Sequence, residues 1–307
     1  MIAPTTSNLL LKRHIDRLQR IRESWDERAG VRQPQPSLDW DPEYPDFLVG
    51  LLPFHDHPDF AAAPYEMRMK ALTCGWLAYN EKTVCIESQI IGPACSHLIN
   101  GEIGDFRGDE HRETIAEAMV DEAYHILLVS RSSSISRTRR GLTNVVIPQC
   151  SLVTDMKRRQ EDFPEEWKKR LVTVATSIVS ETLISEYLSR LASAPGVQPL
   201  HCVTTEIHRR DEAAHNGVFK SLGAMLYHTL SLREREFFLD VLVEPTRWFG
   251  NPDLDVWHAM LRQIDFPKAD RIIADCRAEA ARHTNQLDLS TLESLFADLG
   301  VVRELQV

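Results

Sequence analysis

The chain has 307 residues, a formal net charge of −10, 43% hydrophobic residues and 26% charged residues. These values are ordinary for a soluble globular protein, and the negative charge argues against nucleic acid or an anionic membrane as partner. No apolar run reaches the length of a membrane span, the N-terminus is too charged for a secretory signal, and the six cysteines form no C-x-x-C pair. We therefore expect a cytoplasmic protein.

The first half of the chain predicts helices around an N-terminal loop. Residues 7–28 have the pattern of an amphipathic helix, and residues 33–64 are rich in Pro, Asp and aromatic residues, which predicts an ordered surface loop. A long helix is expected from about 64 to 91, where Gly92-Pro93 should kink or end it. A second helix over about 109–133 would then form an antiparallel hairpin with the first.

The second half predicts another hairpin after a crossover. Residues 134–163 are basic and contain Gly and Pro, so they favour a long connection with a solvated basic run at Arg137, Arg139 and Arg140. A docking patch for an acidic partner is the alternative for that run. Long helices are expected over 164–193 and 200–222, and shorter ones near 231–248, 253–264, 268–283 and 289–299.

Together these elements predict an all-α fold, because strand-like alternation is nearly absent. We expect a single domain over residues 1–307, built on a ferritin-like four-helix bundle of about 65–222. The N-terminal helix and loop would occupy 1–64, and the C-terminal helices 223–307.

Two near-identical segments carry the chemistry. Asp-Glu-Ala-Tyr-His ends at His125, and Asp-Glu-Ala-Ala-His ends at His215. Residues three and four apart share one face of a helix, so each segment offers Glu-x-x-His to one side, and His208 joins Glu212 one turn earlier. Two helices that each offer Glu-x-x-His are half of a carboxylate-bridged dinuclear metal site in a four-helix bundle.

The other half of such a site requires one carboxylate from each remaining helix. Glu87 and Glu181 lie on the apolar stripes of the first and third long helices. A single Glu-x-x-His is expected by chance, and a lone buried Glu is sometimes only a hydrogen-bonded core acid. Four clustered carboxylates, however, are costly to bury without cations. The predicted metal ligands are Glu87, Glu122, His125, Glu181, His208, Glu212 and His215.

Charge balance favours two divalent ions, since four ionised carboxylates neutralise two Fe²⁺, and manganese fits the same ligands nearly as well. Zinc fits less well because seven ligands exceed its tetrahedral preference. Asp121 and Asp211 precede the paired glutamates, and metal-bound histidines usually donate their second N–H to a carboxylate. We expect each Asp to accept this bond from the histidine of the opposite helix; two exposed helix acids are the alternative.

At these residues the chain resembles ferritin-like non-haem di-iron proteins, and within them the p-aminobenzoate N-oxygenase family. The resemblance rests on the order of the seven residues, the third histidine at position 208 and the segment YNEKT from Tyr79 to Thr83. It implies the same seven ligands, a homodimer and a buried pocket over the metals. In arylamine oxidases of this family a basic side chain holds the substrate carboxylate, and YNEKT offers Lys82 for that role, beside Tyr79.

The resemblance thus implies an O₂-dependent di-iron N-oxygenase of natural-product biosynthesis, in which we expect His208 and Glu212 to be the central catalytic residues. Its substrate would be the amine of a small molecule, an arylamine or an amino acid, free or tethered to a carrier protein. The product would be a hydroxylamine, nitroso or nitro compound, and an external reductase would supply electrons. A di-iron C–H hydroxylase or a non-catalytic metal-storage bundle remains as an alternative.

Overall fold

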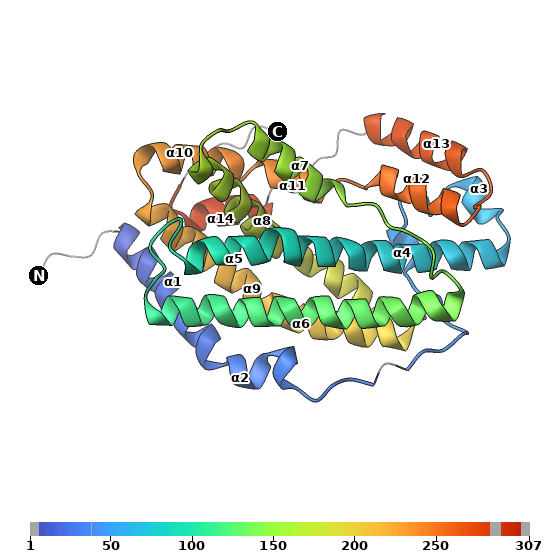
Figure 1. Cartoon of the computed structure of the whole chain (residues 1–307), viewed down its shortest axis with the longest axis horizontal. Helices are drawn as coiled ribbons and strands as arrows, with labels where there is room; N and C mark the ends of the chain where they lie inside the picture. Colours follow the sequence, from blue (N-terminus) through green and yellow to red (C-terminus); the bar gives the residue numbers. More distant parts are fainter. Residues whose placement is uncertain (1–5, 38, 283–289, 302–307) are drawn as a thin grey trace, which may run out of the picture.

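The protein is built almost entirely from α-helices (Figure 1), and no strand occurs among the residues described. The structure is a computed structural model that describes residues 6–37, 39–282 and 290–301. Four long helices form the centre: α4 (Tyr65–Ile86), α6 (Asp109–Arg140), α8 (Glu166–Ala192) and α9 (Pro199–Thr229). The predicted all-α, ferritin-like bundle is confirmed.

The long helices pair as two hairpins, as expected. Helix α4 packs against α6, and α8 packs against α9 over the most extensive helix–helix contact of the described chain. Helix α8 is apolar and long enough to span a membrane, but 76% of its most apolar stretch is buried inside the protein. Its apolar composition is therefore explained by its place in the bundle core.

The first long rod does not end at Gly92-Pro93, so of the two outcomes predicted there, a kink or an end, the end is wrong. A π-helical turn, η3 (Glu87–Ile91), follows α4, and α5 (Gly92–Ile99) continues in the same direction, so Figure 1 shows one long rod. The N–H of Gly92 donates to the carbonyl of Glu87, five residues earlier. Pro93 then falls in the first turn of α5, where its missing N–H is tolerated. The wider turn thus replaces the expected break.

Helix α6 extends to Arg140, so the basic run belongs to a helix and not to the connection, which corrects the prediction; Arg139 is exposed, as expected, while Arg137 and Arg140 are half-buried. Gly141, with φ 68°, ends the helix in the left-handed conformation. Arg140 Nε donates to Asp46 at 2.8 Å, and Arg137 donates to the carbonyls of Leu142 and Val145. Arg140 therefore holds the loop that leads to α4, and Arg137 holds the loop that follows α6.

The remaining helices surround this bundle. The crossover contains a helix that was not predicted, α7 (Ser151–Glu161), and the expected helix 231–248 is two, α10 (Leu232–Val241) and α11 (Glu244–Phe249). The later helices lie where they were expected; the predicted ends at 283 and 289 are outside the described residues. They are α12 (Leu254–Gln263), α13 (Ala269–Arg282) and α14 (Ser290–Asp298).

The N-terminal segment crosses the bundle (Figure 1). The helix expected over 7–28 divides into α1 (Thr6–Glu23), which packs on α9, and α2 (Trp25–Arg28). A 3₁₀ turn, η1 (Gly30–Arg32), contacts both α6 and α9. Two further short elements, η2 (Val49–Leu51) and α3 (Pro58–Ala61), belong to the loop that leads to α4.

Candidate dinuclear metal centre

All seven predicted ligands lie in the interior of the bundle. Each central helical rod contributes one carboxylate, and none of the seven side chains belongs to a residue more than 4% exposed. The contributions are Glu87 from η3, Glu122 and His125 from α6, Glu181 from α8, and His208, Glu212 and His215 from α9. Helical spacing therefore puts these polar groups on the faces that meet at the bundle axis.

Six of the seven form two overlapping groups, each able to hold one metal ion. One group is Glu87, His125, His208 and Glu212; the other is Glu122, His125, Glu212 and His215. Within each group the candidate ligand atoms all lie within 4.8 Å of one another. Glu181 belongs to neither group, but its Oε2 lies 3.8 Å from His215 Nδ1, at the edge of the second. Glu212 and His125 are common to both groups.

The two repeated histidines have the same orientation. His125 directs Nδ1 toward the carboxylates, 3.3 Å from Glu122, while its Nε2 lies 3.1 Å from Asp211. His215 likewise directs Nδ1 toward Glu122, and its Nε2 lies 3.2 Å from Asp121. Both aspartates are fully buried and accept from the histidine of the opposite helix, so the two hydrogen bonds expected from the sequence are present. Such bonds fix the tautomer and ring plane of a metal-binding imidazole.

His208 faces the centre with its other nitrogen. Its Nε2 lies 3.1 Å from Glu212 Oε1 and 3.3 Å from Glu87 Oε1. Its Nδ1 is buried without a hydrogen-bond partner, so no acidic residue fixes this ring from behind. The third histidine is therefore held differently from the repeated pair.

The donor atoms fit bound cations. One oxygen of each glutamate (Glu87, Glu122, Glu181, Glu212) is buried without a hydrogen bond. His215 Nδ1 lies 2.8 Å from a Glu122 oxygen, but the two atoms do not have hydrogen-bond geometry. A buried polar atom left unsatisfied costs about 1–3 kcal/mol. Several such atoms converging on one place are what a metal centre requires, so these residues suit two metal ions.

Burial and crowded negative charge shift the pKa values of the cluster. Burial raises the pKa of Glu87 well above its usual range, and the charge of Glu122 adds to this. Burial and the charge of Glu212 do the same to the pKa of Glu181. Burial lowers the pKa of His125, but its acidic neighbours outweigh burial and raise that pKa well above its ordinary value. These raised pKa values of Glu87, Glu181 and His125 have one cause in common, the concentration of buried negative charge, which bound cations would balance.

The N-terminal segment supplies hydrogen-bond donors to Asp121 and Asp211 that the sequence did not predict. Trp25 Nε1 donates to both oxygens of Asp121 at 3.1 Å, and the backbone N–H of Gly30 donates to Asp211 at 3.1 and 3.2 Å. Arg28 lies between them, with 3.4 Å to Asp211 and 3.9 Å to Asp121. Each aspartate thus has a histidine on one side and N-terminal donors on the other. No local pattern in the sequence links this segment to the two motifs.

A cavity of about 560 Å³ adjoins the centre. It is lined mainly by apolar and aromatic side chains of α4, α8, the loop before α4 and the segment around α11 and α12. Thr83, Ile86, Ile184 and Phe249 also line a second space of about 20 Å³, which reaches Glu87, Glu181, His208 and Glu212. The large cavity therefore leads toward the face of the centre that carries His208.

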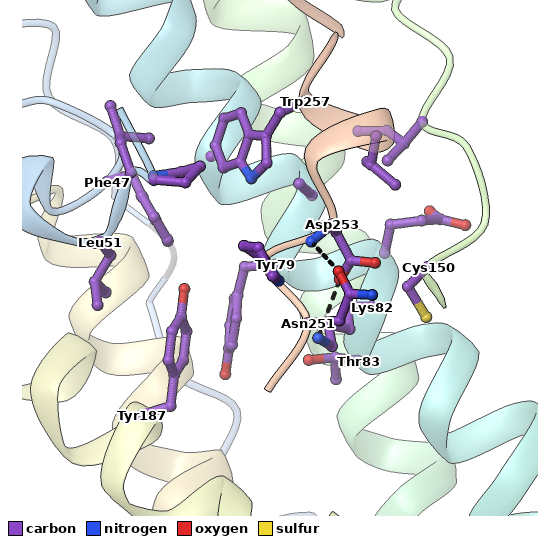
Figure 2. A pocket seen from close by; sticks show the side chains of 18 of the residues that line it. Phe47, Leu51, Tyr79, Lys82, Thr83, Cys150, Tyr187, Asn251, Asp253 and Trp257 are labelled. Carbon is purple, nitrogen blue, oxygen red and sulfur yellow. Dashed lines mark hydrogen bonds and ion pairs between the residues drawn. The ribbon is translucent and has the colours of Figure 1, made fainter. Parts of the chain in front are cut away.

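Tyr79 and Lys82, the predicted substrate residues, both line the large cavity. Tyr79 stacks on Tyr187, with ring centroids 5.3 Å apart, and Figure 2 shows these rings side by side on one wall. Lys82 is engaged elsewhere, because its Nζ lies 3.1 Å from Asp253 Oδ2. The cavity thus has an aromatic wall, while its lysine is paired.

A helical bundle with two overlapping carboxylate–histidine groups at its axis, each able to hold a metal ion, defines the ferritin-like class. The family model described as p-aminobenzoate N-oxygenase AurF matches residues 12–300. The chain therefore belongs to the p-aminobenzoate N-oxygenase family and is an oxygenase. It is also 28% identical to the 4-aminobenzoate N-oxygenase of Streptomyces thioluteus over 290 residues, which cover 92% of this chain and 86% of that protein.

Proposed function

We propose that the protein is an O₂-dependent dimetal N-oxygenase that oxidises the amino group of an aromatic amine. The observation that carries the proposal is the position of the aromatic cavity, which shares four lining residues with the space before Glu87, Glu181, His208 and Glu212. A substrate ring in the cavity could present its nitrogen to that face of the centre. The name of the Streptomyces relative agrees with this substrate class.

In this proposal the seven buried carboxylate and imidazole groups hold two metal ions, iron or manganese. Once bound, the ions supply the redox chemistry by which O₂ is reduced. Asp121 and Asp211 hold the rings of His215 and His125, since each accepts from the Nε2 of one of them. The burial of these residues keeps bulk water away from the reacting atoms.

We assign the central roles to Glu212 and His208. Glu212 belongs to both candidate groups, so its carboxylate would help to hold both ions. His208 is the histidine that lines the small space facing the cavity, whereas His125 and His215 do not line it. His208 would therefore occupy a position on the side where O₂ and the amine meet.

The reaction requires partners. Inserting one oxygen atom of O₂ and reducing the other to water consumes two electrons from outside, so we propose an external reductase. We propose a homodimer because α6 exposes Val120 at 44% and Leu127 at 45%, two turns apart on one side. A cytoplasmic location agrees with the free state of all six cysteines. We place the enzyme in natural-product biosynthesis, with a free or carrier-bound substrate and a hydroxylamine, nitroso or nitro product.

The test is to load the protein with iron, reduce it, and add O₂ with a panel of aromatic amines and amino acids. Mass analysis should show one or two oxygen atoms on the nitrogen of an arylamine. Oxygen found on carbon would indicate the C–H hydroxylase alternative. If every amine were returned unchanged while the iron was oxidised, the N-oxygenase proposal would fail.

A further inference from the structure

We infer that the cavity selects an uncharged arylamine, one that lacks a carboxyl group or carries it masked as an ester, amide or thioester. The inference rests on the proposed function, because it concerns the substrate of the same site. Its basis is the engagement of Lys82 by Asp253, shown by the dashed contact in Figure 2. A lysine that already has an anionic partner is not free to hold a substrate carboxylate.

Lys82 has three partners within the protein. Its Nζ lies 3.1 Å from Asp253 Oδ2 and 3.3 Å from the carbonyl oxygen of Phe249. The same nitrogen lies 5.4 Å from the centroid of the Phe249 ring, in cation–π contact. The side chain of Lys82 is 24% exposed and that of Asp253 is 13% exposed, so the pair is largely shielded from water. Asp253 therefore neutralises the charge of Lys82 in this wall of the cavity.

Asp253 is itself fixed in place. Its Oδ1 accepts from the backbone N–H of Ser151 at 2.7 Å, and its own N–H donates to Asn251 Oδ1 at 2.9 Å. Its backbone has φ 51°, a left-handed conformation that Asp and Asn adopt more readily than most residues. The carboxylate therefore links the crossover to the start of α12 and does not depend on Lys82 to hold its position.

A substrate carboxylate beside this pair would meet a cation whose charge is already balanced. It would lose its hydration on entering the cavity and would also be repelled by Asp253. An uncharged ester, amide or thioester loses much less hydration free energy when it enters the cavity. Besides Lys82, the cavity lining contains one other permanently charged basic residue, Arg190. Arg190 is exposed to solvent. A volume of about 560 Å³ also leaves room for a substituent on the ring.

The test compares two ligands that differ only at the acid, 4-aminobenzoate and its methyl ester. Their dissociation constants are measured by calorimetry on the metal-loaded protein, before any O₂ is added. Wild type should bind the ester at least about tenfold more tightly, which corresponds to about 1.4 kcal/mol. Tighter binding of the free acid to wild type would overturn the inference, and loss of that preference in Arg190→Met would show which cation held the acid instead.

The decisive variant is Asp253→Asn, which frees Lys82 while it keeps an acceptor for Ser151 and tolerates the left-handed backbone. It should gain affinity for 4-aminobenzoate by at least about tenfold and leave the affinity for the ester nearly unchanged. The double variant Lys82→Met/Asp253→Asn should lose this gain. An unchanged ligand preference in Asp253→Asn would overturn the inference. Binding is measured without turnover, so the preference for the ester can be tested even if no amine is oxidised. A failure to oxidise any amine would contradict the proposed function but not this inference.

Discussion

The indole nitrogen of Trp25 lies 3.1 Å from both carboxylate oxygens of Asp121, a residue 96 positions later in the chain. Asp121 accepts in turn from His215, whose other nitrogen faces the glutamates of the centre. A residue of the short helix α2 is therefore connected through two hydrogen bonds to a candidate metal ligand. The N-terminal segment is in this way part of the site.

Trp25→Phe should weaken metal binding with little change in fold, because it removes only the indole donor and leaves His215 less firmly held. We expect the affinity for the metal to fall by about 10–100-fold, the usual effect of removing such an outer partner. Competition with a chelator measures this. Trp40→Phe is the matched control, since Trp40 donates at 3.4 Å to Asp46, which pairs with Arg140 and His201 and not with a candidate ligand. Equal losses in both variants would contradict the link.

Gly30→Ala should disturb the N-terminal donors on the side of Asp211. A Cβ at position 30 would lie 2.8 Å from Asp211 Oδ2 and 2.7 Å from Ile207 Cγ2, closer than atoms of folded proteins tolerate. We expect a loss of about 1–3 kcal/mol in the free energy of unfolding, with weaker metal binding. In Gly108→Ala the new Cβ would lie 3.5 Å from His111, an ordinary contact, so this control should retain its metal.

Glu212→Ala should reduce the metal content of the purified protein, which we expect to be two iron or manganese ions per chain in wild type. The variant removes the carboxylate common to both candidate groups. Glu206→Ala changes the same helix outside the centre, where Glu206 pairs only with Arg209 and Arg210 among described residues. Elemental analysis of both variants decides the matter, and equal metal contents would refute the assignment of Glu212.

His208→Ala should fold and still bind metal, since the other six residues match the set of simpler dinuclear sites. N-oxygenation should nevertheless fall by at least about 10–100-fold, as a direct ligand should matter no less than an outer partner. His258→Ala is the control, because His258 pairs with Asp270 at the surface, away from the centre. Wild-type turnover by the His208 variant would show that this imidazole only fills space.

His201 should make stability depend on pH. Burial lowers its pKa to about 4, while an unfolded histidine titrates near 6.5. Between pH 4 and 6.5 the unfolded chain therefore binds a proton at His201 that the folded chain does not. The contribution of His201 to the free energy of unfolding is complete above pH 6.5 and is lost as pH falls toward 4. The loss should reach about 3 kcal/mol. Urea unfolding of wild type and His201→Gln across this range should give a shallower slope for the variant; parallel curves would rule out His201 as the cause.

Local repetition made the centre predictable from the sequence. The two Glu-x-x-His segments lie within single helices, so the spacing of their residues already defines which side chains share a face. The apolar stripes that carry Glu87 and Glu181 extended the same argument to the other helices. Trp25 and Arg28 could not be found in this way, because their contacts join segments far apart in the chain and depend on how α2 lies on the bundle.

The extent of α6 was mispredicted for a related reason. Residues 132–140 contain four serines and one threonine, whose side chains compete locally with helical hydrogen bonds, so local propensity favours a connection there. Ser132 and Ser136 are fully buried, however, and Ser136 Oγ lies 2.8 Å from His201 Nε2. Arg140 adds the contact with Asp46. Tertiary contacts thus stabilise a helix that the local sequence alone does not predict.

The π-helical turn at Glu87–Ile91 has a consequence for how this chain can change by insertion and deletion. The hydrogen bond of a π-helical turn spans five residues where that of an α-helix spans four, so the turn holds one extra residue. Deleting one residue from this turn should therefore restore a regular α-helix and leave α4 and α5 in register. A deletion in α4 between Tyr79 and Glu87 would instead rotate Tyr79 by about 100° relative to Glu87. The π-helical turn is thus the place in this rod where the chain can lose one residue at the least cost to the cavity wall.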